Sequence, residues 1–311
     1  MKYVRNSRNR DNKKAGLYLM PALVSISILT MIPVLYTVFL SFTDKNLKHM
    51  DDYKLVGFSN YVKIVAGPLK DIFLPVFGWT FLFAGVTVLL GYLLGLFFAM
   101  LLNNKHMKEK NVYKSLLILP WALPATIATL AWQGLLNQDY GGINLLLKSM
   151  HLTDSNIAWL TTPTLARFAV IVVSIWFTYP FMMNVCLGAL QAIPETYYEA
   201  AQIDGANKFQ QFMKITLPSL AGSSYPLIIS SFAMNFNNFG AVYLITEGGP
   251  PVLGGSLFAG STDILASAAY KMSMLFFRYD YAGALAVLIF AIVAGISFVN
   301  MKLSGQFEEV N

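Results

Sequence analysis

Charged residues are scarce in this chain: Asp, Glu, Lys and Arg make up 12% of its 311 residues, against about a quarter in a typical soluble domain. Hydrophobic residues make up 56%, and the mean hydropathy is +0.55. Six apolar runs contain no Asp, Glu, Lys, Arg or His, and each is long enough to cross about 30 Å of hydrocarbon. We therefore expect an all-α membrane protein with six transmembrane helices, at residues 17–42, 78–102, 115–136, 168–190, 219–242 and 281–301.

Cysteine and histidine are also scarce, and several catalytic motifs are missing. The only cysteine, Cys186, lies in the fourth expected span, so it forms no disulfide framework and we expect it to pack as a small apolar residue. His49, His106 and His151 lie far apart and offer no metal-ligand spacing. The chain has no G-x-x-x-x-G-K-[ST] phosphate loop and no set of catalytic side chains at one depth, so we predict neither nucleotide binding nor enzymatic activity.

Basic residues predict the topology, because Lys and Arg resist transfer across the membrane. They are concentrated before the first run and between the second and third, which places these segments and both termini in the cytoplasm. We expect the first run to be a retained span, because it is too long for a signal peptide and no small-residue cleavage site follows it. The inner segments then carry thirteen basic and seven acidic residues, and the outer segments nine of each. The pI near 9.2 thus reflects topology and contact with anionic lipid, and does not require nucleic acid.

The most informative segment is a polar interruption at 191–218, between the fourth and fifth spans. It contains Glu199-Ala200-Ala201, then Gly205, and ends with Ile215-Thr216-Leu217-Pro218. The alanines allow close approach, Gly205 allows a sharp bend, and Pro218 suits the entry of a helix. We expect two short helices joined by a tight turn, which form a knob on the cytoplasmic surface that can dock on another protein.

The fifth expected span has a polar face. At 100° per residue, Ser231, Asn235 and Asn238 fall within an arc of about 60°, while Asn237 points away. Amides and a hydroxyl beside phenylalanine and methionine suit a neutral, hydroxyl-rich ligand such as a sugar. The alternative is that these asparagines hydrogen-bond a neighbouring helix.

Prolines and glycines predict how the spans bend and pack. Prolines occur in the first, third, fourth and fifth spans, where we expect bends and a central cavity. Gly91 and Gly95 form a small-xxx-small pair that suits close helix packing.

Two sets of residues resemble a known family. The spacing E-A-A-x3-G-x9-I-x-L-P over 199–218 matches the coupling-loop signature of permease subunits in bacterial binding-protein-dependent ABC importers. Further segments are similar to the larger maltose and maltodextrin permease subunits, in the short form of Gram-positive bacteria that lacks extra amino-terminal spans and a large outer-loop insertion. These segments are 179–191, the asparagine-rich 231–239, 246–250 and 259–263. Residues 57–61 (G-x-x-N-Y) resemble an element that follows the first span in sugar permeases of the same superfamily.

The resemblance implies the type I ABC importer permease fold in the bacterial inner membrane. It implies a basic cytoplasmic amino terminus (1–16), a single six-helix domain (17–303) with its coupling loop at 191–218, and a cytoplasmic tail (304–311). The matching substrate positions are Ser231, Asn235, Asn238, Phe177, Thr178, Phe181 and Met234. The matching ATPase-coupling positions are Glu199, Ala200, Ala201, Asp204, Gly205 and Pro218.

The resemblance also implies the partners. These are a second permease subunit, two cytoplasmic ATPase subunits that bind ATP and Mg²⁺, an extracellular sugar-binding protein, an oligosaccharide and membrane lipid. The implied cargo is maltose or maltodextrin, and a raffinose-type sugar or another α-glucoside is the alternative. An ion-coupled secondary sugar transporter is a remote alternative, because such carriers place ionisable groups inside the membrane and all six spans here lack them.

Overall fold

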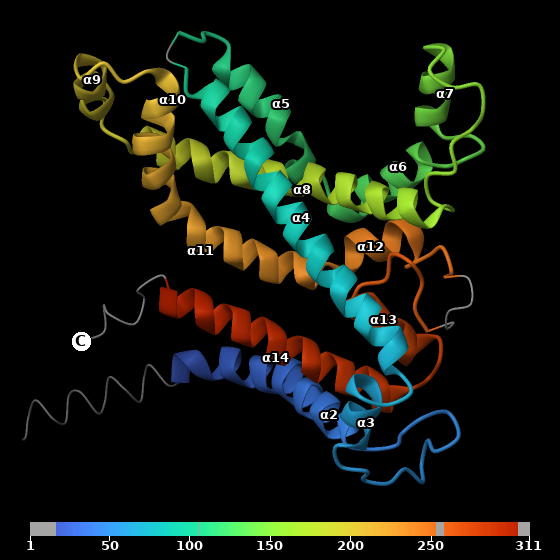
Figure 1. The fold of residues 1–311 in the computed structure, drawn as a ribbon. Coiled ribbons are helices and arrows are strands. Elements are labelled where there is room, and N and C mark those ends of the chain that lie inside the picture. The colour runs from blue at the N-terminus through green and yellow to red at the C-terminus, as the bar shows by residue number, and fades with distance from the viewer. Residues whose placement is uncertain (1–16, 105, 253–257, 304–311) are drawn as a thin grey trace, which may run out of the picture.

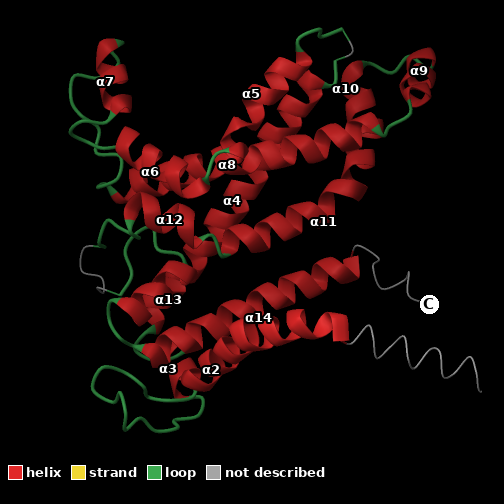
Figure 2. Ribbon diagram, turned by 180° about the vertical axis from the view of Figure 1, so that it is seen from behind, coloured by secondary structure: helices red, strands yellow, loops and turns green. Residues whose placement is uncertain are grey.

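A computed structural model describes residues 17–104, 106–252 and 258–303, and these residues form helices joined by loops (Figures 1 and 2). The predicted terminal segments 1–16 and 304–311 lie outside these described residues. No strand occurs among the residues that the structure describes. In chain order the helices are Leu17–Ser41, which contains the π turn η1 (Ser27–Met31) and α2 (Ile32–Ser41), α3 (Ser59–Val65), α4 (Lys70–Leu102), α5 (Lys110–Ala122), α6 (Ala125–Leu135), α7 (Gly142–Ser149), α8 (Pro163–Gln191), α9 (Glu195–Ile203), α10 (Lys208–Gln211), the π turn η2 (Phe212–Thr216), α11 (Leu217–Phe236), α12 (Phe239–Thr246), α13 (Leu265–Met274) and α14 (Tyr279–Leu303).

Four of the six expected spans are single helices that are long and apolar enough to cross a membrane: Leu17–Ser41, α4, α8 and α14. The other two are broken, since α5 and α6 meet at 91° and α11 and α12 at 42°. Counting each bent pair once gives the six predicted spans. The first break follows from Pro124, because proline disfavours helical backbone at the preceding Leu123, which is extended (φ −79°, ψ 144°).

Helices α8, α11 and α14 have similar slopes across the molecule, and α4 crosses α8 obliquely (Figure 1). Helices α9 and α10 lie at one end of them, while α3, α7 and α13 lie at the other, and Figure 2 shows the same separation from behind. The start of the first helix and the end of α14 lie at the α9 end. The first helix therefore begins, and α14 ends, at the end of the molecule that holds the 191–218 segment.

Two π turns precede prolines in the helices. The turn Ser27–Met31 ends two residues before Pro33, and Phe212–Thr216 ends two residues before Pro218. Proline has no N–H to donate and its ring clashes with the carbonyl of the residue four positions earlier, so a wider turn accommodates it. Pro218 is the second residue of α11, as expected at a helix entry, and the π turn η2 joins α11 to α10, so the backbone is helical without interruption over 208–236.

Helices α4 and α8 form the centre of the bundle, and two glycines allow them to pack closely. A Cβ atom added to Gly95 would lie 2.7 Å from the Met183 backbone nitrogen, and one added to Gly91 would lie 2.9 Å from Thr178 Cγ2. The backbones approach too closely for a larger residue at Gly95. The predicted role of these glycines in helix packing is confirmed.

We therefore expect Gly95→Ala to lower the free energy of unfolding by about 1–3 kcal/mol, the usual cost of overpacking a tight interface. Thermal unfolding of the protein in detergent measures the change. Gly78→Ala is the matched control in α4, because a Cβ atom there meets nothing within 4 Å. Equal melting temperatures for the two variants would contradict this account of the α4–α8 contact.

The loops beyond α12 are held by a buried carboxylate. Asp263 is 1% exposed and accepts hydrogen bonds from the Gly260 N–H (2.6 Å), the Ser267 hydroxyl (2.7 Å) and the Lys271 ammonium (2.7 Å). A side chain on Gly248, whose φ is +79°, would overlap the Asp263 carboxylate. Two segments that the sequence singled out, 246–250 and 259–263, are thus packed on each other.

Removing this carboxylate leaves a nearly buried ammonium without its partner, which typically costs about 3–5 kcal/mol. We expect Asp263→Ala to destabilise the protein by that amount, as measured by thermal unfolding in detergent. Asp154→Ala, which removes an exposed carboxylate from another loop, serves as the control and should change stability little. A melting temperature for Asp263→Ala equal to that of the control would show that the carboxylate does not hold these loops.

The G-x-x-N-Y segment has a structural role at the end of the first span. The Asn60 amide donates to the carbonyls of Ser41 (2.9 Å) and Thr43 (2.7 Å), and the Tyr61 hydroxyl donates to Ser41 Oγ (2.6 Å). Asn60 is 1% exposed. These contacts attach α3 to the carboxyl end of α2.

Candidate functional site

A cavity of about 530 Å³ lies at the α11–α12 break, between these helices, α8 and the end of α5. All seven substrate positions that the sequence predicted line it, so the structure brings them together in one place. Along the part of the chain that the structure describes, no ionisable side chain lines this cavity. Its lining residues are Trp121, Phe177, Thr178, Phe181, Ser231, Met234, Asn235, Asn237, Asn238, Phe239 and Gly240.

The break in the fifth span comes from asparagine, because this side chain can replace backbone hydrogen-bond partners at a helix end. Helix α11 ends at Phe236, and Asn237 leaves the helical conformation (φ −111°, ψ 16°). Asn238 then caps α12, with its Oδ1 accepting from the Ala241 N–H at 3.3 Å. The expectation that Asn237 points away is wrong, because it assumed an unbroken helix, and all three asparagines line the cavity.

The polar groups of the cavity keep unused hydrogen-bonding capacity. Asn235 is 7% exposed, and its Nδ2 donates to the Ser231 carbonyl at 2.9 Å. Its Oδ1 accepts no hydrogen bond from any residue that the structure describes. Thr178 donates its hydroxyl to the Ser174 carbonyl (2.8 Å), so its oxygen can still accept. The amides and the hydroxyl can therefore pair with a ligand that carries hydroxyl groups.

Aromatic rings form the opposite wall. The Trp121 and Phe181 ring centroids lie 6.3 Å apart, and Phe177 is supported from behind by Trp176 at 5.0 Å. Met234, on the α11 side, is 75% exposed. Apolar rings beside neutral amides suit the two kinds of surface on a sugar, its C–H faces and its hydroxyls.

Sequence reasoning missed Trp121 as a lining residue. The 91° break after α5 places this ring beside the cavity, and a second hollow of about 340 Å³ continues from it along α6. The two hollows share Trp121, Phe177, Asn238 and Gly240. The signal in the sequence is the pair Pro120 and Pro124 on either side of the ring, which indicates a sharp change of direction there.

The polar interruption forms a second candidate site at the opposite end of α11. Helix α9 is followed by Gly205 in the left-handed region (φ +79°), and Asn207 begins α10 with a capping box that pairs it with Gln210. The Tyr198 hydroxyl and Thr216 Oγ1 lie 2.9 Å apart, which attaches α9 to η2. The predicted pair of short helices and the tight turn are present.

The coupling positions are arranged so that most of them face outward. Glu199, Ala200, Asp204 and Gly205 are exposed and Ala201 is half-buried. Pro218 lies apart from them, inside the helical run that continues into α11. The knob is therefore an accessible surface. It is continuous with α11, the helix that also lines the cavity.

Comparison with known proteins identifies related chains. The family model "Binding-protein-dependent transport system inner membrane component" matches residues 91–302. The maltose/maltodextrin transport system permease protein MalF of Klebsiella aerogenes is 41% identical over 254 residues, which cover 79% of this chain and 48% of that protein. The protein of the same name from Escherichia coli K12 is 41% identical over 253 residues, with the same coverage. This chain spans about half the length of these curated relatives.

Solved structures show the same fold. A crystal structure of a bacterial ABC transporter involved in the import of the acidic polysaccharide alginate superimposes with a TM-score of 0.75 at 21% identity, covering 96% of this chain and 99% of that one. A second structure, of a bacterial alginate ABC transporter in complex with an alginate pentasaccharide-bound periplasmic protein, gives 0.73 at 21% identity, with 97% of each chain covered. At this identity the similarity establishes the arrangement of helices.

Proposed function

Since the chain belongs to the family of inner membrane components of binding-protein-dependent transport systems, we propose that it is the permease subunit of an ATP-driven oligosaccharide importer, with maltose or maltodextrin as cargo. It forms half of the translocation pathway together with a second permease subunit. ATP and Mg²⁺ are bound by two separate cytoplasmic ATPase subunits, and a sugar-binding protein delivers the cargo from outside. The 41% identity to maltose/maltodextrin permease proteins supports the choice of cargo.

The main support for this proposal is the uncharged cavity at the α11–α12 break. A neutral oligosaccharide needs hydroxyl-pairing groups and apolar faces at one place, and Asn235, Asn238 and the Trp121 ring offer both. An acidic polysaccharide would need a basic residue there to balance its charge. The lining thus favours a neutral cargo over the acidic one named for the structural neighbours.

The fold also supports a route for coupling. The helical backbone runs without interruption over 208–236, so a displacement of α10 moves the cavity end of α11. From Lys208 to Asn235 this helix spans roughly 40 Å. We propose that closure of the ATPase pair pushes the 191–218 knob, and that α11 transmits the movement to Ser231 and Asn235. The two states then differ in the contacts they offer the sugar, which alternating access requires.

The test is reconstitution with the cognate second permease subunit, ATPase and sugar-binding protein in proteoliposomes. We expect uptake of labelled maltotriose that depends on ATP and on the binding protein. Uptake of raffinose with none of maltotriose would replace the proposed cargo with the raffinose-type alternative. Uptake driven by an ion gradient without ATP would overturn the importer mechanism altogether.

A further inference from the structure

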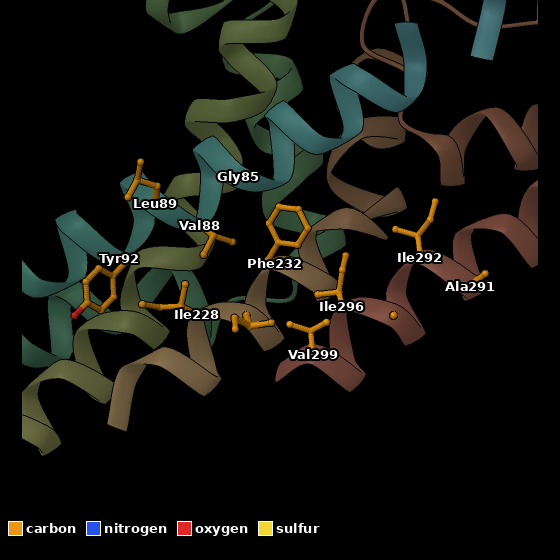
Figure 3. A pocket seen from close by; sticks show the side chains of 12 residues that line it. Gly85, Val88, Leu89, Tyr92, Ile228, Phe232, Ala291, Ile292, Ile296 and Val299 are labelled. Atoms are coloured by element: carbon orange, nitrogen blue, oxygen red, sulfur yellow. The ribbon is translucent and has the colours of Figure 1, made fainter. Parts of the chain in front are cut away.

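A second, apolar groove of about 630 Å³ lies between α4, α11 and α14, apart from the sugar cavity (Figure 3). Its twelve lining residues are hydrophobic or glycine apart from the hydroxyl group of Tyr92. Phe232 and Ile228 project into it from α11, and Ile296 and Val299 from α14 (Figure 3). Because Ser231 and Asn235 line the sugar cavity, α11 contributes residues to both sites.

Two glycines keep the groove open. A Cβ atom added to Gly295 of α14 would meet nothing within 4 Å, and one added to Gly85 of α4 would meet only the Phe232 ring at 3.8 Å. The Asn300 amide donates to the Pro226 carbonyl at 3.2 Å and so attaches α14 to α11 beside Val299. The groove is therefore bounded by helices that are tied together at this end.

The size of the groove indicates its occupant. From Ala291 to Val299 the groove follows α14 for roughly 12 Å, so its mean cross-section is roughly 50 Å². An α-helix with side chains is about 10–12 Å wide and needs roughly 80 Å² or more. A hydrocarbon chain fits inside this space, whereas a helix of another chain could lie only across the mouth of the groove, and all three walls are membrane spans or parts of spans.

A charge at one end indicates the head group. Lys302 lies three residues after Val299, on the same side of α14 and one turn further along it, and it is exposed. A lysine near the membrane surface attracts an anionic lipid by about 1 kcal/mol. We propose that this groove binds one acyl chain of an anionic phospholipid, with the phosphate next to Lys302. The bound chain fills the space between α4, α11 and α14 and supports α11, the helix that also lines the sugar cavity.

The test uses the purified transporter complex in lipid nanodiscs that contain phosphatidylglycerol with a diazirine on one acyl chain. After illumination, mass spectrometry should find the label on peptides that contain 85–92 and 291–299. We expect Gly295→Leu to fill the groove and lower this labelling by roughly tenfold, and the smaller Gly295→Val to lower it less. Gly78→Leu, an exposed glycine with open space in α4, is the control and should label like the wild type.

The same experiment with a phosphatidylcholine probe tests the head group. We expect the wild type to prefer phosphatidylglycerol by about fivefold, which corresponds to about 1 kcal/mol, Lys302→Gln to lose this preference and Lys302→Arg to keep it. Equal labelling of wild type and Gly295→Leu would overturn the site, as would a cross-link from Gly295→Cys to another protein chain. Because sugar uptake is not measured, these outcomes do not depend on the proposed transport function.

Discussion

Replacing Asn235 by leucine is expected to lower the rate of sugar uptake by about 100-fold, which corresponds to about 2.7 kcal/mol. Its Oδ1 has no partner among the described residues and lines the cavity, so it is free to accept a hydrogen bond from a sugar hydroxyl. Without it, a hydroxyl enters the cavity unpaired, at a cost of about 1–3 kcal/mol for each lost partner. The measurement is ATP-dependent uptake of labelled maltotriose by the assembled transporter.

The control is Asn184→Leu, also in a span. Asn184 donates to the Pro180 carbonyl at 3.0 Å, as Asn235 does to Ser231 at 2.9 Å, but it does not line the cavity. The two variants therefore lose the same kind of intrahelical hydrogen bond. We expect both to assemble with the partner subunits and only Asn235→Leu to lose uptake. If Asn235→Leu transports like Asn184→Leu, the asparagine face does not bind the sugar.

Asn238 needs a different substitution, because its side chain also caps α12. Asn238→Leu should abolish uptake as well, but part of its effect comes from the lost cap, worth about 1 kcal/mol. Asn238→Ser keeps an oxygen that can cap the helix and removes the amide group. A loss of uptake in Asn238→Ser with unchanged thermal stability would assign the effect to the sugar.

Replacing Gly205 by valine is expected to reduce sugar uptake to background while the chain still inserts and assembles. Gly205 has a φ of +79°, a region that costs a β-branched residue about 1–3 kcal/mol, so the turn between α9 and α10 must change. The knob then no longer presents Glu199, Ala200 and Asp204 in one arrangement to the ATPase. Uptake and ATP hydrolysis, measured on the same proteoliposomes, should become uncoupled.

Gly57→Val is the matched control. Gly57 also has a positive φ (+59°) and open space around it, but it lies at the opposite end of the long helices. A comparable strain there should leave coupling intact. Gly205→Asn should retain part of the activity, because asparagine adopts the left-handed conformation more readily. Normal uptake by Gly205→Val would refute the coupling role of this turn.

Local patterns predicted several parts of this protein correctly. The six apolar runs correspond to four single helices and two bent pairs. The E-A-A and glycine spacing corresponds to two short helices joined at Gly205, and the G-x-x-x-G pair lies in the α4–α8 contact. Each depends on neighbours in sequence or on the period of a helix, so composition and spacing are sufficient to find it.

The prediction that assumed a continuous fifth span was wrong. Asn237 lines the cavity because α11 ends one residue before it. Pro218 is the second residue of α11, as expected, but the π turn before it joins this helix to α10, which the sequence did not indicate. Trp121 reaches the cavity through a 91° break. The apolar groove exists because Gly85 and Gly295, which are 210 positions apart in the sequence, face the same space.

The sequence alone determined the class of the protein, its spans, the knob at 191–218 and the uncharged residue types that line the cavity, because these depend on hydropathy, charge and local backbone preference. Only the tertiary structure decided which side chains share a cavity and which residues of α11 line the cavity or the apolar groove. Small differences in bend angle at Pro124 and Asn238 rotate and displace whole helices, and such displacements depend on packing against residues far away in the chain.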